Sequence, residues 1–332
     1  MKKKSLNIKI PLLSIALLAA SFVALFWSDL SAYVQAEEYG VEFLIGVSQC
    51  NLAEPYRAKM NADIAKAAEA YPNIKVIFTD AAQSNEKQIS DIQYLVDSGI
   101  DLLIVSPNES EPLTEAVAQA YDKVPVIVLD RELSGDEFSL FIGADNYAIG
   151  KQCAKNIVAA LGEAGGNIIE ITGLVGSAPA VLRSNGFYDE IARHPQFQIV
   201  ASINADWLRD ESYDRLFAWC QDNPDICVDA IYSQNDPMAL GARWVMDSFS
   251  QHPAIVGIDG LPGKGNGIEL VKQGTIYATC VYPTCGPEAI EYALKILNGE
   301  KLEEKYITLP FENVTQSTKN TVKNESNHDT NN

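Results

Sequence analysis

The chain has 332 residues, of which 47% are hydrophobic and 21% are charged, a composition typical of a globular protein with one large or two medium-sized domains. Its net charge is −19, although the first 36 residues carry four lysines against one aspartate. An acidic surface of this kind repels nucleic acid and anionic membranes, so no nucleic-acid partner is expected, whereas an uncharged ligand is compatible with it.

The N-terminal segment, residues 1–36, has the features of an export signal. The cationic stretch MKKK precedes an almost wholly apolar run from Pro11 to Trp27, and Val34-Gln35-Ala36 is an imperfect match to a small-x-small cleavage site. The apolar run has about 17 residues, at the short end of what spans a bilayer. Residues 10–27 therefore form part of a cleaved signal peptide or an uncleaved membrane anchor, and in both cases the rest is expected to be extracytoplasmic, in the periplasm or cell envelope.

From residue 41 onward, apolar runs alternate with amphipathic stretches. FLIGVS (43–48) is a run of the kind that forms a buried strand, and the stretch from Pro55 to Tyr71 places apolar residues at helical spacing. Continuous apolar strands separated by helices indicate a parallel sheet that is covered on both faces. In the first half, further strands are expected at 75–80, 101–107, 124–130 and 139–145, and helices at 86–99, 111–122 and 147–162.

The same pattern then starts again in a second half of similar length. Two α/β halves of about 100 residues each match the usual size of a domain. After residue 313 the chain is polar and poor in apolar residues, so 314–332 is expected to be a disordered tail. In the second half, strands are expected at 167–173, 197–205, 229–236, 254–260 and 275–283, and helices at 179–194, 212–223, 239–249 and 286–299.

The cysteines leave two interpretations open. No CxxC motif is present and histidine is scarce, so a zinc site is not expected. Cys220 and Cys227, and likewise Cys280 and Cys285, are close enough in sequence to form disulfides in an oxidising compartment. Buried free thiols are the alternative.

Polar and charged side chains follow the expected strands in both halves. In an open parallel sheet, ligands bind beyond the carboxyl ends of the strands, where loops present side chains without disturbing the core. Any one of these residues could instead cap the following helix, but their recurrence at seven strand ends favours a shared site. The residues are Gln49, Glu54, Tyr56 and Arg57; Asp80; Asp130 and Arg131; Ser177 and Arg183; Asp206 and Trp207; Gln234, Asn235 and Asp236; and Asp259.

These residue types suit a neutral ligand that carries several hydroxyl groups. A carboxylate accepts hydrogen bonds from two adjacent hydroxyls, an arginine donates to two, and an asparagine does both. A tyrosine or tryptophan covers the C–H face of a ring. A phosphate ligand would favour glycine-rich loops, and the one such cluster, GKGNG at 263–267, is a single turn after Asp259.

An enzyme is not expected. The first strand leads into GVSQCN, which lacks the GxGxxG pattern of dinucleotide-binding enzymes, and GLVGSA lacks the GxSxG form of a serine hydrolase. His194, His252 and His328 lie in loop-like or tail contexts that do not suit a general base. The sequence therefore indicates no catalytic residues, no metal ligands and no cofactor.

The region from about residue 41 to 312 resembles the type I periplasmic sugar-binding proteins of the ribose and galactofuranose kind. The resemblance implies an α/β fold of two doubly wound parallel-sheet lobes, joined by a three-crossing hinge, with the ligand cleft between them. It places 40–145 and 283–303 in lobe 1, and 146–282 and 304–313 in lobe 2. The stretches that carry it are IGVSQ…YR (45–57), VIVLDRELS (126–134), GADN (143–146), GLVGSAPAVLRSNGF (173–187), YSQNDPMALGA (232–242), VGIDGLP (256–262) and LKILNGEK (294–301).

The resemblance also implies ligand-binding residues at the positions that match the family pattern. In lobe 2, Arg183, Asn235 and Asp259 match family ligands, and Trp207 stands where an aromatic ring usually stacks. In lobe 1, the resemblance implies an acid–arginine pair, and it also implies the aromatic–arginine pair that galactofuranose-type members have. Two further residues of lobe 1 are included because each follows an expected strand. These expected residues are Asp130 and Arg131, Tyr56 and Arg57, and Gln49 and Asp80.

The implied function is an extracytoplasmic solute-binding protein that binds a monosaccharide by hinge closure and delivers it to an ABC-type sugar transporter, with a membrane permease as partner. One stretch departs from the transporter pattern, since Val281 and Tyr282 stand where a glutamine or glutamate is usual near the second hinge crossing. SQCNLAEPYRAKMN (48–61) and YPT (282–284) look more like the periplasmic sensor domains of some hybrid histidine kinases. The alternative is therefore a membrane-tethered sugar-sensing subunit that signals to a histidine kinase.

Overall fold

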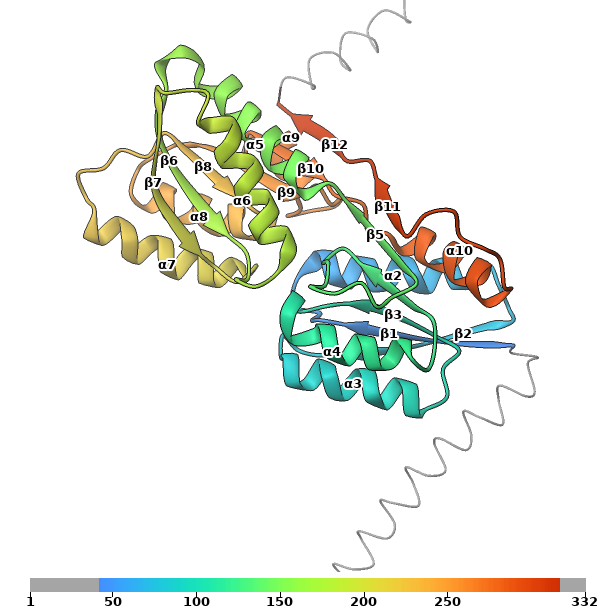
Figure 1. Cartoon of the computed structure of the whole chain (residues 1–332). Coiled ribbons are helices and arrows are strands. Elements are labelled where there is room, and N and C mark those ends of the chain that lie inside the picture. Colours follow the sequence, from blue (N-terminus) through green and yellow to red (C-terminus); the bar gives the residue numbers. More distant parts are fainter. Residues whose placement is uncertain (1–41, 317–332) are drawn as a thin grey trace, which may run out of the picture.

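The computed structural model describes residues 42–316 as two α/β lobes connected by several segments of chain (Figure 1). The expected export segment, residues 1–36 with its apolar part 10–27, lies outside the described residues. Within residues 42–316, no helix combines the length and the apolar character that crossing a bilayer requires.

The first lobe comprises β1 (Phe43–Gln49), α2 (Pro55–Ala68), β2 (Ile74–Asp80), α3 (Asn85–Asp97), β3 (Leu102–Ser106), α4 (Ser110–Tyr121), β4 (Val126–Leu129), β5 (Leu140–Ala144), α10 (Gly286–Leu297) and β11 (Tyr306–Leu309). Its strands form a parallel sheet in the order β11-β5-β4-β3-β1-β2. Helices α2 and α10 pack together on one face, and α3 and α4 pack on the other (Figure 1). The central strands β3, β4 and β5 are buried along their whole length, as continuous apolar runs require.

The second lobe comprises α5 (Asn146–Leu161), the short 3-10 helix η1 (Gly162–Ala164), β6 (Gly166–Thr172), α6 (Ala178–Ile191), β7 (Phe197–Asn204), α7 (Arg209–Asp222), β8 (Ala230–Ser233), α8 (Asp236–Ser248), β9 (Ala254–Asp259), α9 (Gly267–Gln273), β10 (Ala278–Val281) and β12 (Glu312–Thr315). Its sheet has the order β12-β10-β9-β8-β6-β7 and is parallel except for β12. Helices α5 and α6 pack together, as do α7 and α8 (Figure 1). The predicted fold class, two α/β lobes with parallel sheets, is confirmed.

The chain passes between the two sheets from β5 to α5, from β10 to α10 and from β11 to β12. The last of these passages differs from the expected boundary. Strand β11 pairs with β5 of the first lobe, so the chain crosses at residues 310–311, whereas the resemblance places all of 304–313 in lobe 2. Residues 314 and 315, expected in the tail, belong to β12. Both strands are four residues long and partly exposed at sheet edges, so they lack the apolar run that identifies the buried strands.

The six cysteines, all within the described residues, are free thiols. Neither pairing considered from the sequence, Cys220 with Cys227 or Cys280 with Cys285, is formed. Cys220 is buried on α7 while Cys227 is exposed in the loop that follows. The thiol of Cys280 instead lies on the side of β10 that faces α5, where its Sγ is 3.9 Å from Sγ of Cys153.

Two glycines bring α5 and α6 into close backbone contact. A Cβ atom at Gly150 would lie 2.1 Å from the carbonyl oxygen of Arg183, and one at Gly186 would lie 2.0 Å from the carbonyl oxygen of Tyr147. Neither position has room for a methyl group. Because Arg183 projects from α6, this helix contact fixes its place relative to α5, which follows the first passage between the lobes.

We expect Gly186→Ala to lower the free energy of unfolding by about 1–3 kcal/mol, because the added methyl overpacks the α5–α6 contact. Alanine favours a helix by about 1 kcal/mol over glycine, so a loss of stability would report the steric clash. Urea denaturation measures the effect, and Ser90→Ala on the exposed side of α3 is the control, with an expected change below about 0.5 kcal/mol. A Gly186→Ala protein as stable as the wild type would contradict the close packing.

Candidate functional site

Residues that follow strands of both lobes meet in a narrow cavity, which we call the inner cradle. They come from the loops and helix starts after β1 and β4 in the first lobe, and after β6, β7, β8 and β9 in the second. This is the edge of each sheet at which parallel strands present ligand-binding side chains. The inner cradle is lined by Glu54, Tyr56, Arg57, Asp130, Pro179, Arg183, Trp207, Asn235 and Asp259.

The first lobe contributes a buried cluster of carboxylates and arginines. Arg57 Nη2 lies 2.7 Å from Asp130 Oδ2. Arg131 Nη1 donates a hydrogen bond of 2.7 Å to the carbonyl oxygen of Asn108, and its Nη2 lies 3.6 Å from Glu54 Oε1. Burial alone would raise the pKa of Asp130, but the neighbouring arginines hold that pKa below its usual value. The charges of this cluster therefore compensate one another in a site removed from water.

Three residues of the inner cradle have a left-handed backbone. The φ angle is 66° at Asp130, 70° at Trp207 and 117° at Asp259. Such conformations cost residues other than glycine on the order of 1–3 kcal/mol each, and they persist where the surrounding structure fixes them. Each of these residues lies at or just beyond the end of a strand, so the strain turns its side chain out of the sheet into the cleft.

The second lobe holds Arg183 from two sides. Its Nε donates a hydrogen bond of 2.8 Å to Asn146 Oδ1, and its Nη1 donates one of 2.7 Å to the carbonyl oxygen of Gln234. Gln234 is itself fixed, because its Oε1 accepts from the backbone N–H of Gly173 and its Nε2 donates to the carbonyl oxygen of Ala180. The guanidinium is thus placed by the supporting side chains before any ligand contact.

Trp207 provides the aromatic surface of the inner cradle. The guanidinium carbons of Arg131 and Arg183 lie 5.5 and 5.4 Å from its ring centroid, within the range of cation–π contacts. Asn235 Nδ2 donates to the carbonyl oxygen of Trp207 at 3.0 Å, while Asn235 Oδ1 accepts from the backbone N–H of Met238 and caps α8. Asn235 therefore holds the Trp207 backbone and keeps one amide proton available for another acceptor.

Several buried donors at this site have no hydrogen-bond partner within residues 42–316. They are Arg57 Nε, Trp207 Nε1, and both Nε and Nη2 of Arg131. Buried polar groups nearly always have partners, and an unmade hydrogen bond costs about 1–3 kcal/mol. Clustered donors of this kind match a ligand that is rich in acceptor oxygens.

Two carboxyl groups lie at the second-lobe side of the cleft. Asp236 accepts hydrogen bonds from the backbone N–H of Gly260 at 2.7 Å and from Thr279 Oγ1 at 2.8 Å. Burial raises the pKa of Asp236 to about 7, and these hydrogen bonds offset only part of that effect. Burial, and then the charge of Asp236, raises the pKa of Asp259 well above its usual value. A carboxyl that keeps its proton can donate as well as accept a hydrogen bond.

The lobes touch along one rim of the cleft. The backbone N–H of Ser110 in the first lobe donates to the carbonyl oxygen of Gly176 in the second, at 3.0 Å. Nearby, Gln83 Nε2 donates to the carbonyl oxygen of Asp206 at 3.1 Å. These bonds join the two lobes directly, so the described conformation is closed along this rim.

Tyr282 connects two of the passages between the lobes. It follows β10, and its hydroxyl oxygen accepts from the backbone N–H of Ala144 at 3.2 Å and from Asn146 Nδ2 at 3.3 Å. Tyr56 of the first lobe packs edge-on against its ring and donates to the carbonyl oxygen of Pro283 at 2.8 Å. Tyr282 therefore ties the segment between β5 and α5 to the segment between β10 and α10.

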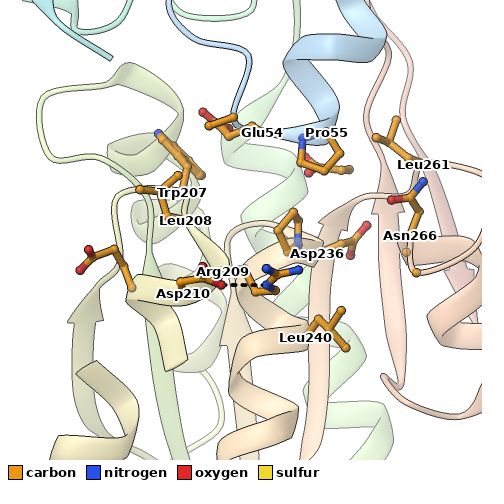
Figure 2. Close-up of a pocket in the computed structure, with 16 residues that line it drawn as sticks. Glu54, Pro55, Trp207, Leu208, Arg209, Asp210, Asp236, Leu240, Leu261 and Asn266 are labelled. Carbon is orange, nitrogen blue, oxygen red and sulfur yellow. Dashed lines mark hydrogen bonds and ion pairs between the residues drawn. The ribbon is translucent and has the colours of Figure 1, made fainter. Parts of the chain in front are cut away.

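A larger cavity, the outer chamber, adjoins the inner cradle and has a volume of about 470 Å³. Figure 2 shows Glu54 and Pro55 at one side of it, with Leu240 and other second-lobe residues at the other. Glu54, Trp207 and Asp259 line both cavities, so the two spaces share a wall.

The structure brings most of the predicted site residues together around the inner cradle and leaves three outside its lining. Arg131 is buried beside it and contacts Trp207. Gln49 Nε2 donates to Asn61 Oδ1 on α2 at 2.9 Å, and Asp80 Oδ1 accepts from a backbone N–H in the turn after β2. Gln49 and Asp80 are thus used within the first lobe and line neither cavity. The predicted residues that do line the cradle are Tyr56, Arg57, Asp130, Arg183, Trp207, Asn235 and Asp259.

Glu54 and Asp236 are among the polar residues that follow strands, but neither they nor Tyr282 are among the expected ligand-binding residues. Glu54 stands directly before a proline at a helix start, where an acidic residue is usually a cap, yet its side chain makes no capping bond and faces the arginines instead. Asp236 stands at a similar helix start. At a helix start, an acidic residue can cap the helix or face the site, and the sequence alone does not show which partner its side chain has.

Comparisons with known proteins agree on one family. The family described as a periplasmic binding protein domain matches residues 45–301. The ribose import binding protein of Bacillus subtilis (strain 168) is 30% identical over 83% of this chain and 88% of its own, and that of Escherichia coli (strain K12) is 31% identical over 83% and 92%. A solved structure described as the fructose binding periplasmic domain of a hybrid two component system is 36% identical, covers 86% of this chain and 95% of its own, and has a TM-score of 0.80.

The buried carboxyl of Asp236 predicts a pH dependence of stability. Its pKa of about 7 in the folded protein exceeds the ordinary value of 3.8, so the folded state retains a proton that the unfolded state releases. The free energy of unfolding should therefore fall as pH rises from about 4 to about 7, by on the order of 2–4 kcal/mol from this group. Asp236→Asn should weaken that slope, as measured by urea denaturation from pH 4 to 8.

The control for this experiment is Asp247→Asn, which alters a half-exposed carboxylate at the end of α8. We expect its curve to run parallel to that of the wild type. If Asp236→Asn also gave a parallel curve, Asp236 would not be the group that retains the proton.

Proposed function

The chain belongs to the family described as a periplasmic binding protein domain, and from this premise we propose that it binds a monosaccharide between its two lobes. One observation carries the proposal: buried side chains of both lobes converge on the inner cradle, and several of their donors have no partner within the described residues. The proposed contacts come from the predicted residues that line the cradle, with Arg131 supporting them from beside Trp207.

The chemistry of the inner cradle suits a neutral sugar. Arg57 Nε and Trp207 Nε1 supply donors, and Asp130 and Asp259 supply carboxyl oxygens for hydroxyl groups. The indole of Trp207 supplies a flat apolar face for the C–H groups of a ring. Acidic side chains and arginines are interspersed in the cradle. An anionic ligand would therefore leave the carboxylates without a partner, and a cationic ligand would leave the arginines without one.

Binding would proceed by opening and closing of the hinge. The inner cradle has a free volume of only about 10 Å³ in the described conformation. On this measure a cavity needs about 10–15 Å³ to hold one water molecule, so a sugar ring enters only when the lobes move apart. The ligand then favours the closed state through contacts that exist only when both lobes meet around it.

The primary role that we propose is delivery of the sugar to an ABC-type transporter, with a membrane permease as partner. The names of the ribose import binding proteins of B. subtilis and E. coli support it. The protein would then act in the periplasm or cell envelope, with residues 1–36 directing its export. Its relatives are binding proteins, so the proposal includes no catalytic step.

The second candidate is a sugar-sensing subunit, tethered by residues 10–27, that signals to a histidine kinase. It is favoured by the 36% identity to the fructose binding domain of a hybrid two component system, which exceeds the 30–31% identity to the ribose import proteins. Deletion of the gene separates the roles. Loss of radiolabelled sugar uptake supports transport, whereas loss of sugar-induced transcription with uptake intact supports sensing.

Sugar binding is tested by thermal shift and calorimetry on the full chain, with D-ribose, D-fructose, L-arabinose, D-galactose and myo-inositol as probes. We expect at least one probe to raise the melting temperature, because a ligand stabilises the state that it binds. Trp207→Phe removes an unpartnered donor but keeps an aromatic ring, and Arg57→Gln removes a charged donor. For the probe that binds, we expect Trp207→Phe to lower the affinity by about 3- to 15-fold and Arg57→Gln to lower it by about 10- to 150-fold.

Arg193→Gln is the matched control, because this arginine is 65% exposed on the second lobe and does not line the inner cradle. It should leave the affinity unchanged. The proposal would be wrong if no probe raised the melting temperature, or if Trp207→Phe and Arg57→Gln both bound sugar as tightly as the wild type.

A further inference from the structure

The outer chamber is a space that a single sugar in the inner cradle leaves unused. Its volume of about 470 Å³ falls within the range of about 300–1,000 Å³ that is usual for pockets that bind small molecules. It lies between the start of α2 in the first lobe and the starts of α7, α8 and α9 in the second. A ligand there would also be held by both lobes.

The chamber is continuous with the inner cradle through shared residues. Glu54 from the first lobe and Trp207 and Asp259 from the second line both spaces. A substituent on a sugar in the inner cradle could therefore pass into the chamber between these side chains. The rim closed by Ser110 and Gln83 offers no such route, because there the lobes are hydrogen-bonded to each other.

The walls of the chamber combine apolar and polar groups in the way that a sugar ring requires. Leu208, Leu240 and Leu261 present apolar surface, and Figure 2 shows them around the space together with Asn266. Such surface packs on ring C–H groups, while the amide of Asn266 both donates and accepts hydrogen bonds.

The charge of the chamber selects against anionic ligands. Asp210 and Glu211 line it and are partly or largely exposed to solvent, so they present negative charge at its mouth. Arg209 is the single basic residue of the lining, and its Nε is already 3.0 Å from Asp210 Oδ1. A phosphorylated or acidic sugar would meet this acidic excess, whereas a neutral one would find acceptors for its hydroxyl groups.

The glycine-rich turn 263–267 contributes to the chamber by occupying little space. Gly265 and Gly267 line it, and a Cβ atom at Gly267 would lie 1.9 Å from Asp236 Oδ2. The missing side chain lets the start of α9 pack directly on the Asp236 carboxyl. The turn, which in the sequence is only weak evidence for a phosphate site, therefore shapes the wall of this space.

We propose that the outer chamber binds a second, uncharged sugar unit that is glycosidically linked to a first unit in the inner cradle. This inference rests on the proposed function, because it needs the first unit to be held in the cradle. It makes a neutral disaccharide, or a comparable glycoside, a ligand of the protein in addition to a free monosaccharide.

The test is calorimetry on the full chain with matched pairs of ligands. D-fructose is compared with sucrose and inulobiose, and D-galactose with lactose. Leu240→Trp fills the chamber from the second lobe. We expect a compound ligand to bind at least as tightly as its free sugar, and Leu240→Trp to weaken it at least about tenfold while weakening the free sugar less than about threefold.

Two further variants serve as a second test of the chamber and as a control. Ala53→Trp fills the chamber from an exposed position of the first lobe and should reproduce the effect if Leu240→Trp fails to fold. Leu302→Trp, in the loop between α10 and β11, is the matched control and should change neither affinity. The inference is overturned if free sugars bind but no compound ligand does, or if chamber-filling variants weaken both kinds of ligand equally. If no sugar of either kind binds, the proposed function itself fails.

Discussion

The burial of three arginines in the cleft is the constraint on which the rest of this structure depends. Arg57, Arg131 and Arg183 are almost fully removed from water, and a buried charge is tolerated only where partners surround it. Asp130 supplies one partner, and backbone carbonyl oxygens supply others. The compensation is incomplete, because several guanidinium N–H groups have no hydrogen-bond partner among the described residues. A ligand with oxygen atoms would complete it.

The same side chains link the cleft to the hinge. Arg183 donates to Asn146 at the start of α5, and Asn146 in turn donates to the hydroxyl of Tyr282. That hydroxyl also accepts from Ala144, at the end of β5. An unbroken chain of hydrogen bonds therefore runs from a cradle arginine to two of the segments that connect the lobes. A ligand that contacts Arg183 would therefore be linked to the hinge segments through these hydrogen bonds. Binding in the cradle can in this way favour one arrangement of the two lobes over another.

The fold could be predicted from sequence because short apolar runs such as Leu102–Ser106 alternate with amphipathic helices, a pattern that is typical of a covered parallel sheet. The edge strands β11 and β12 carry no such run, so the last passage between the lobes was misplaced. At the site, the ends of the predicted strands indicated which residues lie near the cleft, but not which partner each side chain contacts. Gln49 and Asp80 occupy equivalent positions to Asp130, yet they turn to partners within their own lobe. The left-handed φ of Asp130 and the long-range partners of Glu54 are tertiary features that no local pattern encodes.

The most direct measurement of the central claim is a crystal structure of the protein with a sugar that calorimetry has shown to bind. We predict that sugar oxygen atoms lie within about 3.2 Å of Arg57 Nε and Trp207 Nε1, so that these buried donors gain partners. A sugar found outside the inner cradle and the outer chamber, with both donors still lacking any partner, would contradict the claim.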